Sequence, residues 1–566
     1  MIRFIKKHGA DLLFLLFITL LLMYPYIAED LLPVEHDTFF HVSRIEQLAI
    51  SIKEGNFLPA LYPYENNGYG YASPLFYSDL LLIPSALLHI AGISVSVCYK
   101  ITIGTASFFS ALSMFFLMFK ITGKRSAGWI ASSAYLFSNY HITDIYVRGA
   151  MGEVFALIFL PVILNGLYSI LEMHDTKAWT VLCTGLCGLA LSHNLTFLMG
   201  SVLTALIFFI RLHKIDKDVF KAVFKGVFFA FLLTAFYTIP MIEQLQSQEF
   251  IVDYYASHST LEYYSMDFWQ YFANRTVFGL AGNYLEHDST MLENAGYFLT
   301  FAPLLWIFVK RETKNRYPFV TMSLILGYIC LLLPSSLLPW EKMSFFRIMQ
   351  FPWRFNTLTI VLLSLPASFA FTELFRRRSF SAVLISVILC EGLWHVMPVT
   401  ERTFGITSGM TWEEVKNGAL CNPYYSATYV RVELAGGDYL PLDSVDFRER
   451  SAALRTVDDQ ELDISYTKEG STLTFETGEQ YPSEIMLPLT YYKGYKAYRL
   501  SNGEKEEVAC RESSSGLVIV ECSDQGTYIC TYENTLLRKA CIALSGCTFV
   551  LLILFGRIKK KVPVHQ

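Results

Sequence analysis

The sequence predicts a polytopic α-helical membrane protein with a β-sandwich-like domain near its carboxyl end and a final anchoring helix. Of its 566 residues, 53% are hydrophobic and 17% are charged, whereas a soluble domain is usually about 45–50% apolar and about 25% charged. Apolar runs recur through residues 1–399, and several approach the ~20 residues that cross a hydrocarbon core of about 30 Å. We therefore expect about 12 transmembrane helices together with interfacial helices.

The first helix is expected over residues 11–27. A basic stretch with Arg3, Lys6 and Lys7 precedes an apolar core, as in a signal peptide. No small-residue cleavage site follows, because the core is succeeded by Tyr24-Pro25-Tyr26. We therefore interpret this segment as a retained membrane helix.

Basic clusters between the apolar runs predict the orientation of the chain. They include Lys120, Lys124 and Arg125, then Arg376 to Arg378, and near the end Lys559 to Lys561. Residues 401–533 instead carry more acids than bases. Cytoplasmic loops collect Lys and Arg, so we expect the amino terminus inside and the β domain outside.

The expected organisation has three parts. A membrane domain covers residues 1–399, with outer loops over 29–73 and 241–294. A β-rich extracytoplasmic domain covers residues 400–536. A membrane helix and a basic cytoplasmic tail cover residues 537–566.

Two apolar segments leave the threading open. Residues 74–92 hold Ser78, Asp79 and Pro84, and we expect them to lie in the interface. Residues 179–210 are broken at "SHN" (residues 192–194), which predicts two short helices meeting at an outer apex. The alternative makes each segment one full crossing, but it leaves Lys120 on the outside, against the preference of basic residues for the cytoplasm.

Alternating polar and apolar residues predict antiparallel strands after residue 400. "LDISYTKEGSTLTFETG" alternates around Glu469-Gly470, and "GLVIVECSDQGTYICTY" alternates around residues 524–526. The same region holds Cys510, Cys522 and Cys530. Cys510 and Cys522 could bridge a hairpin, although spacing alone leaves the pairing open.

The segment after the first helix concentrates ionisable residues. On a helix that begins near Asp37, residues Asp37, His41, Arg44 and Leu48 share one face. This pattern suits an amphipathic interfacial helix whose polar row faces a cavity. Alternatively, Asp37 simply caps the helix by accepting a backbone N–H.

Several short motifs together resemble a known group of proteins. They are "NNGYGYASPLFY" (66–77), "IYVRGAMGE" (145–153), "SHN" (192–194), "QFPWRF" (350–355) and "LPLTYYKGYKA" (487–497). With the acidic first loop, they resemble the GT-C superfamily of integral-membrane glycosyltransferases. The chain is more closely similar to a bacterial family labelled 6-pyruvoyl-tetrahydropterin-synthase-related membrane proteins and to YfhO-type proteins. Histidines are not clustered here as a zinc-bound pterin enzyme requires, so we do not expect pterin chemistry.

The resemblance implies transfer of a sugar from a polyprenyl-phosphate carrier to an extracytoplasmic acceptor. Asp37 matches the catalytic acidic residue of such enzymes, and an acceptor hydroxyl needs a base in the transition state. Glu35-His36-Asp37 fits the loose acidic pattern of the superfamily, which makes Glu35 a second candidate. His41 either orients Asp37 or faces water. Glu35 and Asp37 could also hold a divalent metal, but no complete ligand set is visible and we expect no required cofactor.

Other candidates would bind the donor phosphate or the sugar. Arg148, Arg347 and Arg354 fall at outer helix ends, where guanidinium groups bind phosphate oxygens or instead reach lipid headgroups. The substrate-binding candidates are Glu153, His193, Asn194, Tyr69 and Tyr71. Each has a simpler interpretation: Glu153 in an ion pair, His193 and Asn194 as helix caps, and the tyrosines as interfacial aromatics.

The expected partners are a polyprenyl-phosphate-linked sugar, a cell-envelope glycan or polymer acceptor and the lipid bilayer of the cell membrane, with no nucleic acid. Two other functions remain open: a transporter or flippase of lipid-linked saccharides, and a non-catalytic envelope scaffold. A transporter predicts ionisable residues deep within helices and paired repeats. Here the ionisable residues lie mostly near helix ends, with Glu391 as the main exception, and the sequence shows no repeat. Both observations favour the enzyme.

Overall fold

The computed structural model describes residues 2–28, 35–258, 260–273, 291–397, 437–444, 450–479, 481–501 and 503–561. The chain divides into two compact units. The first unit comprises Met1–Val42, Ser94–Phe231 and Ala256–Ser408, and the second comprises Ser43–Ile93, Leu232–Tyr255 and Gly409–Gln566. Each unit is described by itself.

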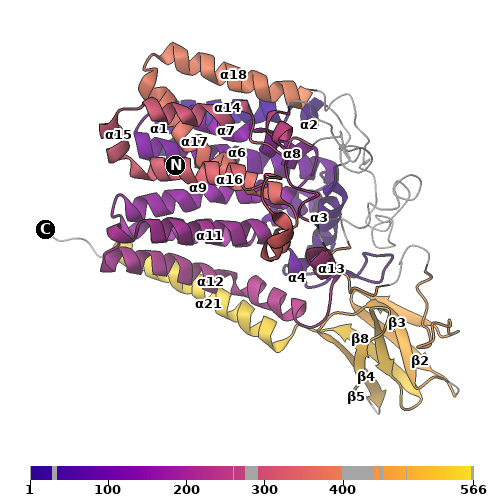
Figure 1. The fold of residues 1–566 in the computed structure, drawn as a ribbon. Helices are drawn as coiled ribbons and strands as arrows, with labels where there is room; N and C mark the ends of the chain where they lie inside the picture. The colour runs from indigo at the N-terminus through magenta and orange to yellow at the C-terminus, as the bar shows by residue number, and fades with distance from the viewer. Residues whose placement is uncertain are drawn as a thin grey trace. The chain divides into compact units, whose positions relative to one another are not determined.

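The first unit is a helix bundle whose long helices run roughly parallel to one another (Figure 1). Its helices are α1 (Ile2–Leu22), α2 (Tyr24–Ala28), α6 (Val95–Thr122), α7 (Arg125–Leu136), α8 (Asn139–Tyr146), α9 (Met151–Leu171), α10 (Trp179–Ala190), α11 (Asn194–Ile210), α14 (Tyr297–Phe301), α15 (Arg311–Arg316), α16 (Pro318–Leu332), α17 (Asn356–Leu374) and α18 (Arg378–Val396). Short 3-10 turns include η4 (Phe268–Phe272), η6 (Ala302–Phe308), η8 (Ser344–Met349) and η9 (Pro352–Phe355). Three helices, α3 (Thr38–Lys53), α12 (Lys217–Leu245) and α13 (Ile251–His258), contain a boundary between the units.

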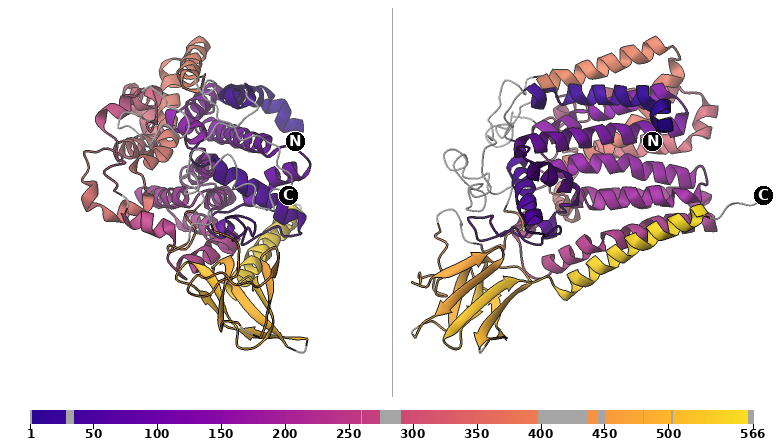
Figure 2. Two further views of the ribbon diagram at one scale, coloured as in Figure 1. Left: turned by 90° about the vertical axis from the view of Figure 1, so that its right-hand side faces the viewer. Right: turned by 180° about the vertical axis from the view of Figure 1, so that it is seen from behind.

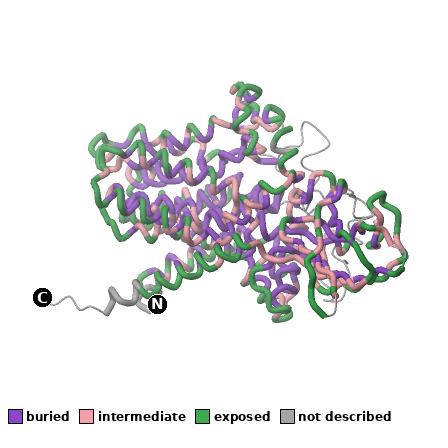
Figure 3. The backbone as a smooth tube through the Cα atoms, turned by 90° about the horizontal axis from the view of Figure 1, so that it is seen from below, coloured by how far each residue is buried: buried purple, intermediate pink, exposed green. Residues whose placement is uncertain are grey.

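Apolar helices confirm the predicted polytopic membrane class. Within the described residues, six helices are long and apolar enough to cross a membrane, and four shorter apolar helices accompany them. The span Pro352–Leu374 is 83% buried, so α17 forms the centre of the first unit, as the buried interior of the bundle in Figure 3 illustrates. Its Ser364, Ser368 and Thr372 hydroxyls donate to main-chain oxygens one turn back, which satisfies them within the apolar core.

Small residues let the helices of the first unit approach closely. A Cβ atom at Gly128 on α7 would lie 2.6 Å from the Phe115 ring on α6. Likewise, a Cβ atom at Gly185 on α10 would lie 2.7 Å from Ile163 on α9. Helices in a bilayer gain little hydrophobic energy from each other, so such close packing contributes much of their association.

Both open apolar segments are divided into short helices, at the predicted break for residues 179–210 and without a predicted break for residues 74–92. Helices α10 and α11 are separate, with Leu191 to His193 between them. Residues 74–92 contain α4 (Ser73–Phe76), η1 (Leu80–Leu82) and α5 (Ile83–Ile90). A helix rises about 1.5 Å per residue, so none of these pieces crosses a core of about 30 Å.

The second unit contains two antiparallel β-sheets. One has the order β1-β2-β8-β4-β5 and the other β3-β7-β6. The strands are β1 (Tyr466–Glu469), β2 (Thr472–Thr477), β3 (Glu484–Thr490), β4 (Tyr495–Ser501), β5 (Glu504–Val508), β6 (Cys510–Glu512), β7 (Leu517–Glu521) and β8 (Gly526–Tyr532). The tight turn between β1 and β2 uses Gly470 at φ +57°, as the Glu469-Gly470 pair predicts. Strands β7 and β8 belong to opposite sheets and do not pair with each other.

Helix α21 (Leu536–Lys561) follows β8 and lies beside the 232–245 part of α12 (Figure 2). Ser545 donates to the Leu232 carbonyl at 2.8 Å and accepts from the Phe236 N–H at 3.0 Å. The aromatic loop before α4 packs on the β-strands of the same unit. There the Thr490 N–H donates to the Tyr69 carbonyl at 2.8 Å. The predicted carboxyl-terminal β domain and the helix after it are therefore both present.

Candidate active site

A short ladder of backbone hydrogen bonds joins two of the motifs in the first unit. The His36 N–H donates to the Val147 carbonyl at 3.2 Å, and the Asp37 N–H donates to the Arg148 carbonyl at 2.8 Å. Gly149 follows at φ +59°, where a Cβ atom would lie 2.7 Å from Thr38 Oγ1. Glycine therefore allows the loop before α3 to lie directly on the loop between α8 and α9.

The Asp37 carboxylate is partly exposed at the start of α3. Among the residues that the structure describes, no donor lies within hydrogen-bonding distance of its side-chain oxygens. The Asp37 main-chain oxygen accepts from the His41 N–H at 3.1 Å, so the first turn of the helix forms without a cap from this side chain. The pKa of Asp37 is raised to about 6. Burial is the main cause and the charge of Glu153 adds to it, whereas the charges of Arg148 and Arg354 oppose the rise.

A buried array of charged groups surrounds Arg148. Its Nη1 donates to Asp144 Oδ1 on α8 at 2.6 Å, and its Nη2 donates to Glu153 Oε1 on α9 at 2.8 Å. Arg354 Nε on η9 donates to the same Glu153 oxygen at 3.2 Å. The Tyr140 hydroxyl donates to Glu153 Oε2 at 2.9 Å. One carboxylate therefore holds two guanidinium groups in fixed positions.

Aromatic rings and a strained residue complete the support of the two arginines. The Arg148 guanidinium lies 4.7 Å from the centroid of Trp353, and that of Arg354 lies 4.8 Å from the centroid of Phe351. Gln350 adopts φ +62°, an uncommon conformation for a residue with a side chain. Its Oε1 accepts from Arg354 Nη1 at 2.7 Å. Sequence reasoning placed Arg354 near the phosphate but missed this aromatic floor.

The array contains two guanidinium groups and two carboxyl groups, and not all of their polar atoms are hydrogen-bonded to the described residues. Burial, followed by the charge of Glu153, raises the pKa of Asp144 well above its ordinary value. Asp144 Oδ2 is enclosed and has no hydrogen bond within the described part of the chain. Arg354 Nη2 also bonds to none of the described residues, and it is not fully enclosed. A further anionic oxygen would complete its hydrogen bonding.

Glu35 lies in different surroundings from Asp37, although only His36 separates them. Its carboxyl is fully buried and accepts from the Tyr26 hydroxyl at 2.9 Å and from the Thr38 hydroxyl. Burial raises the pKa of Glu35 to about 8. No group of three or more His, Cys, Asp or Glu side chains suited to a metal occurs in the parts of the chain described. The candidate metal pair Glu35 and Asp37 thus has no third ligand of these types there.

Two of the polar candidates shape helix ends near the array. His193 Nδ1 accepts from the Thr196 N–H at 3.3 Å and so caps α11. Burial lowers the pKa of His193 to about 3, while the charge of Glu153 raises it. Asn194 is the first residue of α11 and is half-buried. His41 is buried in the first turn of α3 with its ring 5.1 Å from that of Phe40.

Three other candidates do not join the array. Arg347 is exposed in the first unit, where its Nη1 donates to the Ser257 carbonyl at 3.2 Å. Tyr69 and Tyr71 belong to the second unit, and both rings are buried. The Tyr69 hydroxyl donates to the Ser451 carbonyl at 2.9 Å, and the Tyr71 hydroxyl accepts from the Tyr439 N–H at 3.2 Å. These contacts use the tyrosines in packing.

Glu293 is a neighbour that sequence reasoning missed. Its main-chain oxygen accepts from Asn356 Nδ2 at 2.8 Å, and its Oε2 accepts from Gln270 Nε2 at 3.3 Å. Burial raises the pKa of Glu293 to about 8, and the charge of Arg148 lowers it. A single carboxylate at the end of a long polar loop has no local pattern that could reveal this position.

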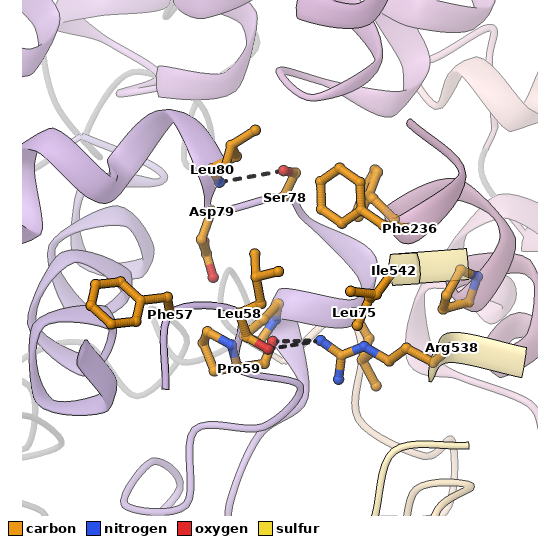
Figure 4. Close-up of a pocket in the computed structure, with 13 residues that line it drawn as sticks. Phe57, Leu58, Pro59, Leu75, Ser78, Asp79, Leu80, Phe236, Arg538 and Ile542 are labelled. Carbon is orange, nitrogen blue, oxygen red and sulfur yellow. Dashed lines mark hydrogen bonds between the residues drawn. The ribbon is translucent and has the colours of Figure 1, made fainter. Parts of the chain in front are cut away.

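A separate small pocket lies within the second unit (Figure 4). Its polar groups are already engaged: Asp79 accepts from Arg44 Nε at 2.8 Å and from Tyr62, and Arg538 Nη2 donates to the Leu58 and Pro59 carbonyls at 3.0 Å. These contacts hold α21 and the loop after α3 together. The pocket therefore offers mainly apolar walls, and we assign it no chemistry.

Comparisons find sequence similarity to a curated protein and structural similarity to solved proteins. An uncharacterized protein from Lactococcus lactis subsp. cremoris (strain MG1363) is 26% identical over 252 residues, which are 43% of this chain and 41% of that protein. The cryo-EM structure of the arabinofuranosyltransferase AftD from mycobacteria is similar with a TM-score of 0.47 and 13% identity, over 71% of this chain and 28% of that chain. This chain thus spans less than half of each protein. No known family profile matches the sequence, so the function proposed below depends on the site geometry.

Proposed function

We propose that the protein is a glycosyltransferase of the GT-C type that moves a sugar from a polyprenyl-phosphate-linked donor to an acceptor hydroxyl outside the cytoplasmic membrane. One observation carries the proposal. The partly exposed Asp37 carboxylate, without a hydrogen-bond donor among the described residues, is fixed by its own backbone to Arg148, whose guanidinium belongs to the buried array. This arrangement puts a base beside an anion-binding group.

Asp37 would act as the general base. The acceptor hydroxyl has a pKa far above 7, so its proton must leave as the oxygen attacks the anomeric carbon of the sugar. A positioned carboxylate typically accelerates such a step by about 10²–10⁴-fold. A pKa of about 6 keeps Asp37 mostly ionised at neutral pH while leaving it basic enough to accept the proton.

Arg148 and Arg354 would bind the donor phosphate. As the bond from the acceptor oxygen to the anomeric carbon forms, the bond from that carbon to the phosphate oxygen breaks, and the phosphate leaves with the electron pair. Guanidinium groups already held in a water-poor site stabilise the developing charge without reorganising. Arg354 Nη2, which bonds to none of the described residues, is the donor best suited to this oxygen.

The second unit would position the acceptor. We propose that its two β-sheets lie outside the membrane and bind a cell-envelope glycan or polymer, with the amino terminus in the cytoplasm. Its basic carboxyl-terminal tail suits a cytoplasmic location. His193, Asn194 and Glu293 would contribute polar groups near the sugar, whereas Tyr69 and Tyr71 serve the packing of the second unit.

The test is sugar transfer by purified protein reconstituted with polyprenyl-phosphate sugars and an envelope acceptor. Asp37→Asn should lower kcat by at least 100-fold, and its melting temperature should stay close to wild type because the side chain makes no hydrogen bond to the described residues. Glu35→Gln is the matched control, since Glu35 is a fully buried carboxyl whose oxygens already accept hydrogen bonds from Tyr26 and Thr38.

Undiminished transfer by Asp37→Asn would rule out this mechanism. Movement of the lipid across the bilayer without transfer of the sugar would favour a transporter instead.

A further inference from the structure

Three cysteines gather in the β-sheets of the second unit. Cys510 begins β6, Cys530 lies in β8, and Cys522 directly follows β7. The proposed glycosyl transfer uses none of them. Spacing alone leaves their pairing open, but the strand registers distinguish the two possible partners of Cys510.

The strand registers bring Cys510 towards Cys530. Ala497 on β4 lies opposite Cys530 on one side and opposite Val508 on the other. The chain leaves this sheet at Ala509 and enters the second sheet at Cys510, which lies opposite Val520 on β7. Ala497 and Cys530 are both fully buried, so both face the interior of the unit.

The two thiols are close enough to interact. A hydrogen bond between the Cys510 and Cys530 sulfur atoms lowers the pKa of Cys510 and raises that of Cys530. Cys522 instead donates from Sγ to the Val520 carbonyl at 3.8 Å. The structure therefore favours Cys530 over Cys522 as the partner of Cys510.

We propose that Cys510 and Cys530 are a disulfide-forming pair that links the two β-sheets. The oxidant is a disulfide on the outer face of the membrane, either a small molecule or a protein thiol oxidase. The proposal is independent of glycosyl transfer, because the pair lies within the second unit and is separate from the Asp37 array of the first.

The exposure of the two sulfurs sets the order of the reaction. Cys510 is partly exposed and has the lower pKa, whereas Cys530 is fully buried. The Cys510 thiolate attacks the oxidant disulfide, forms a mixed disulfide and releases one thiolate. Cys530 then loses its proton to that released group and attacks the Cys510 sulfur, which displaces the second thiolate. Two electrons and two protons thus pass from the cysteines to the oxidant.

Another close pair provides an internal comparison. Cys183 and Cys187 lie one turn apart on α10, with their sulfur atoms 4.0 Å apart. That pair lies within an apolar helix of the bundle, and a bridge inside one helix would constrain nothing else. A bridge between Cys510 and Cys530 would instead tie strands of two sheets and close the intervening chain, which restricts the unfolded state.

The experiment maps free thiols on the full-length protein in detergent. The protein is incubated with oxidised glutathione, denatured with an alkylating reagent present and digested with trypsin. We expect the peptide of residues 506–511 linked to the peptide of residues 512–538, and Cys183 and Cys187 alkylated. Reduction before alkylation should remove the link and lower the melting temperature by roughly 10 °C.

Two variants identify the partner, because residues 512–538 contain both Cys522 and Cys530. Cys522→Ser should keep the link and Cys530→Ser should abolish it. Complete alkylation of Cys510, glutathione on Cys510 without a link, or a link that depends on Cys522 would each overturn the proposal. The wild-type digest decides the existence of the bridge even when a variant fails to fold.

Discussion

Replacement of Gly149 by alanine tests whether the loop on Arg148 sets the position of Asp37. The new Cβ atom would lie 2.7 Å from Thr38 Oγ1, 3.0 Å from Glu35 Cβ and 3.1 Å from the Thr38 nitrogen. Ordinary contact begins at 3.4 Å, so the loop before α3 must retreat by about 0.3–0.7 Å. This shift stretches the two hydrogen bonds that join the loop to Val147 and Arg148.

The expected effect on stability has two parts. A non-glycine residue in the left-handed region costs about 1–2 kcal/mol, and two weakened hydrogen bonds cost about 0.5–1.5 kcal/mol each. The same shift should also slow sugar transfer, since moving a catalytic group by about 1 Å lowers the rate about 100-fold. We expect Gly149→Ala to lower kcat for sugar transfer by at least ~10-fold.

Gly123→Ala is the matched control for backbone strain. Gly123 ends α6 at φ +70°, and a Cβ atom there would meet no other atom within 4 Å. Both variants should lose a few degrees of melting temperature in a thermal scan, and only Gly149→Ala should also lose transfer activity. Equal activity of the two variants would refute the idea that this loop positions the base.

Three further predictions concern the charged residues. The kcat/KM for transfer should rise with pH through about 6 and then level off, because only the ionised Asp37 accepts a proton; a decrease over this range would contradict its role. Glu35→Gln should flatten the pH dependence of the melting temperature between about 5 and 8. Burial raises the pKa of Glu35 to about 8, so the folded wild type keeps a proton that the unfolded chain releases. The wild type therefore loses a free energy of unfolding of order a few kcal/mol as the pH rises towards 8. Arg354→Gln should lower transfer by about 100-fold and destabilise the fold by ~3–5 kcal/mol, because it leaves a buried charge without its partner. Arg347→Gln, at an exposed position, should leave both the activity and the stability unchanged. Equal losses in the two variants would show that burial does not distinguish the two arginines.

Much of the fold follows from the sequence because hydrophobic length and alternation are local properties. The break near His193 and the strands around Gly470 were both visible in this way. The division into two units was not, because each unit is assembled from segments far apart in the chain. The large apolar content of residues 74–92 also hides their division into short helices, since composition alone does not mark a turn.

The candidate site was predictable only in part. The acidic loop and the motifs around Arg148 and Arg354 pointed to the charged residues, but no local signal paired Glu153 with both arginines. Trp353 is 3% exposed and supports Arg148, a role that no local pattern in the sequence indicates. Tertiary contacts decide such roles, and residues more than 200 positions apart, such as Glu153 and Arg354, carry no joint pattern in one sequence.

The sharing of Glu153 also limits how the protein can change over evolution. Loss of either arginine, of the carboxylate or of the Tyr140 hydroxyl leaves a buried polar group without its hydrogen-bond partner. Each single substitution therefore gives a less stable protein. Drift at these positions is therefore blocked unless several change together. Descendants should inherit the quartet whole or replace it whole with apolar side chains, and the second kind would keep the architecture while abandoning the chemistry.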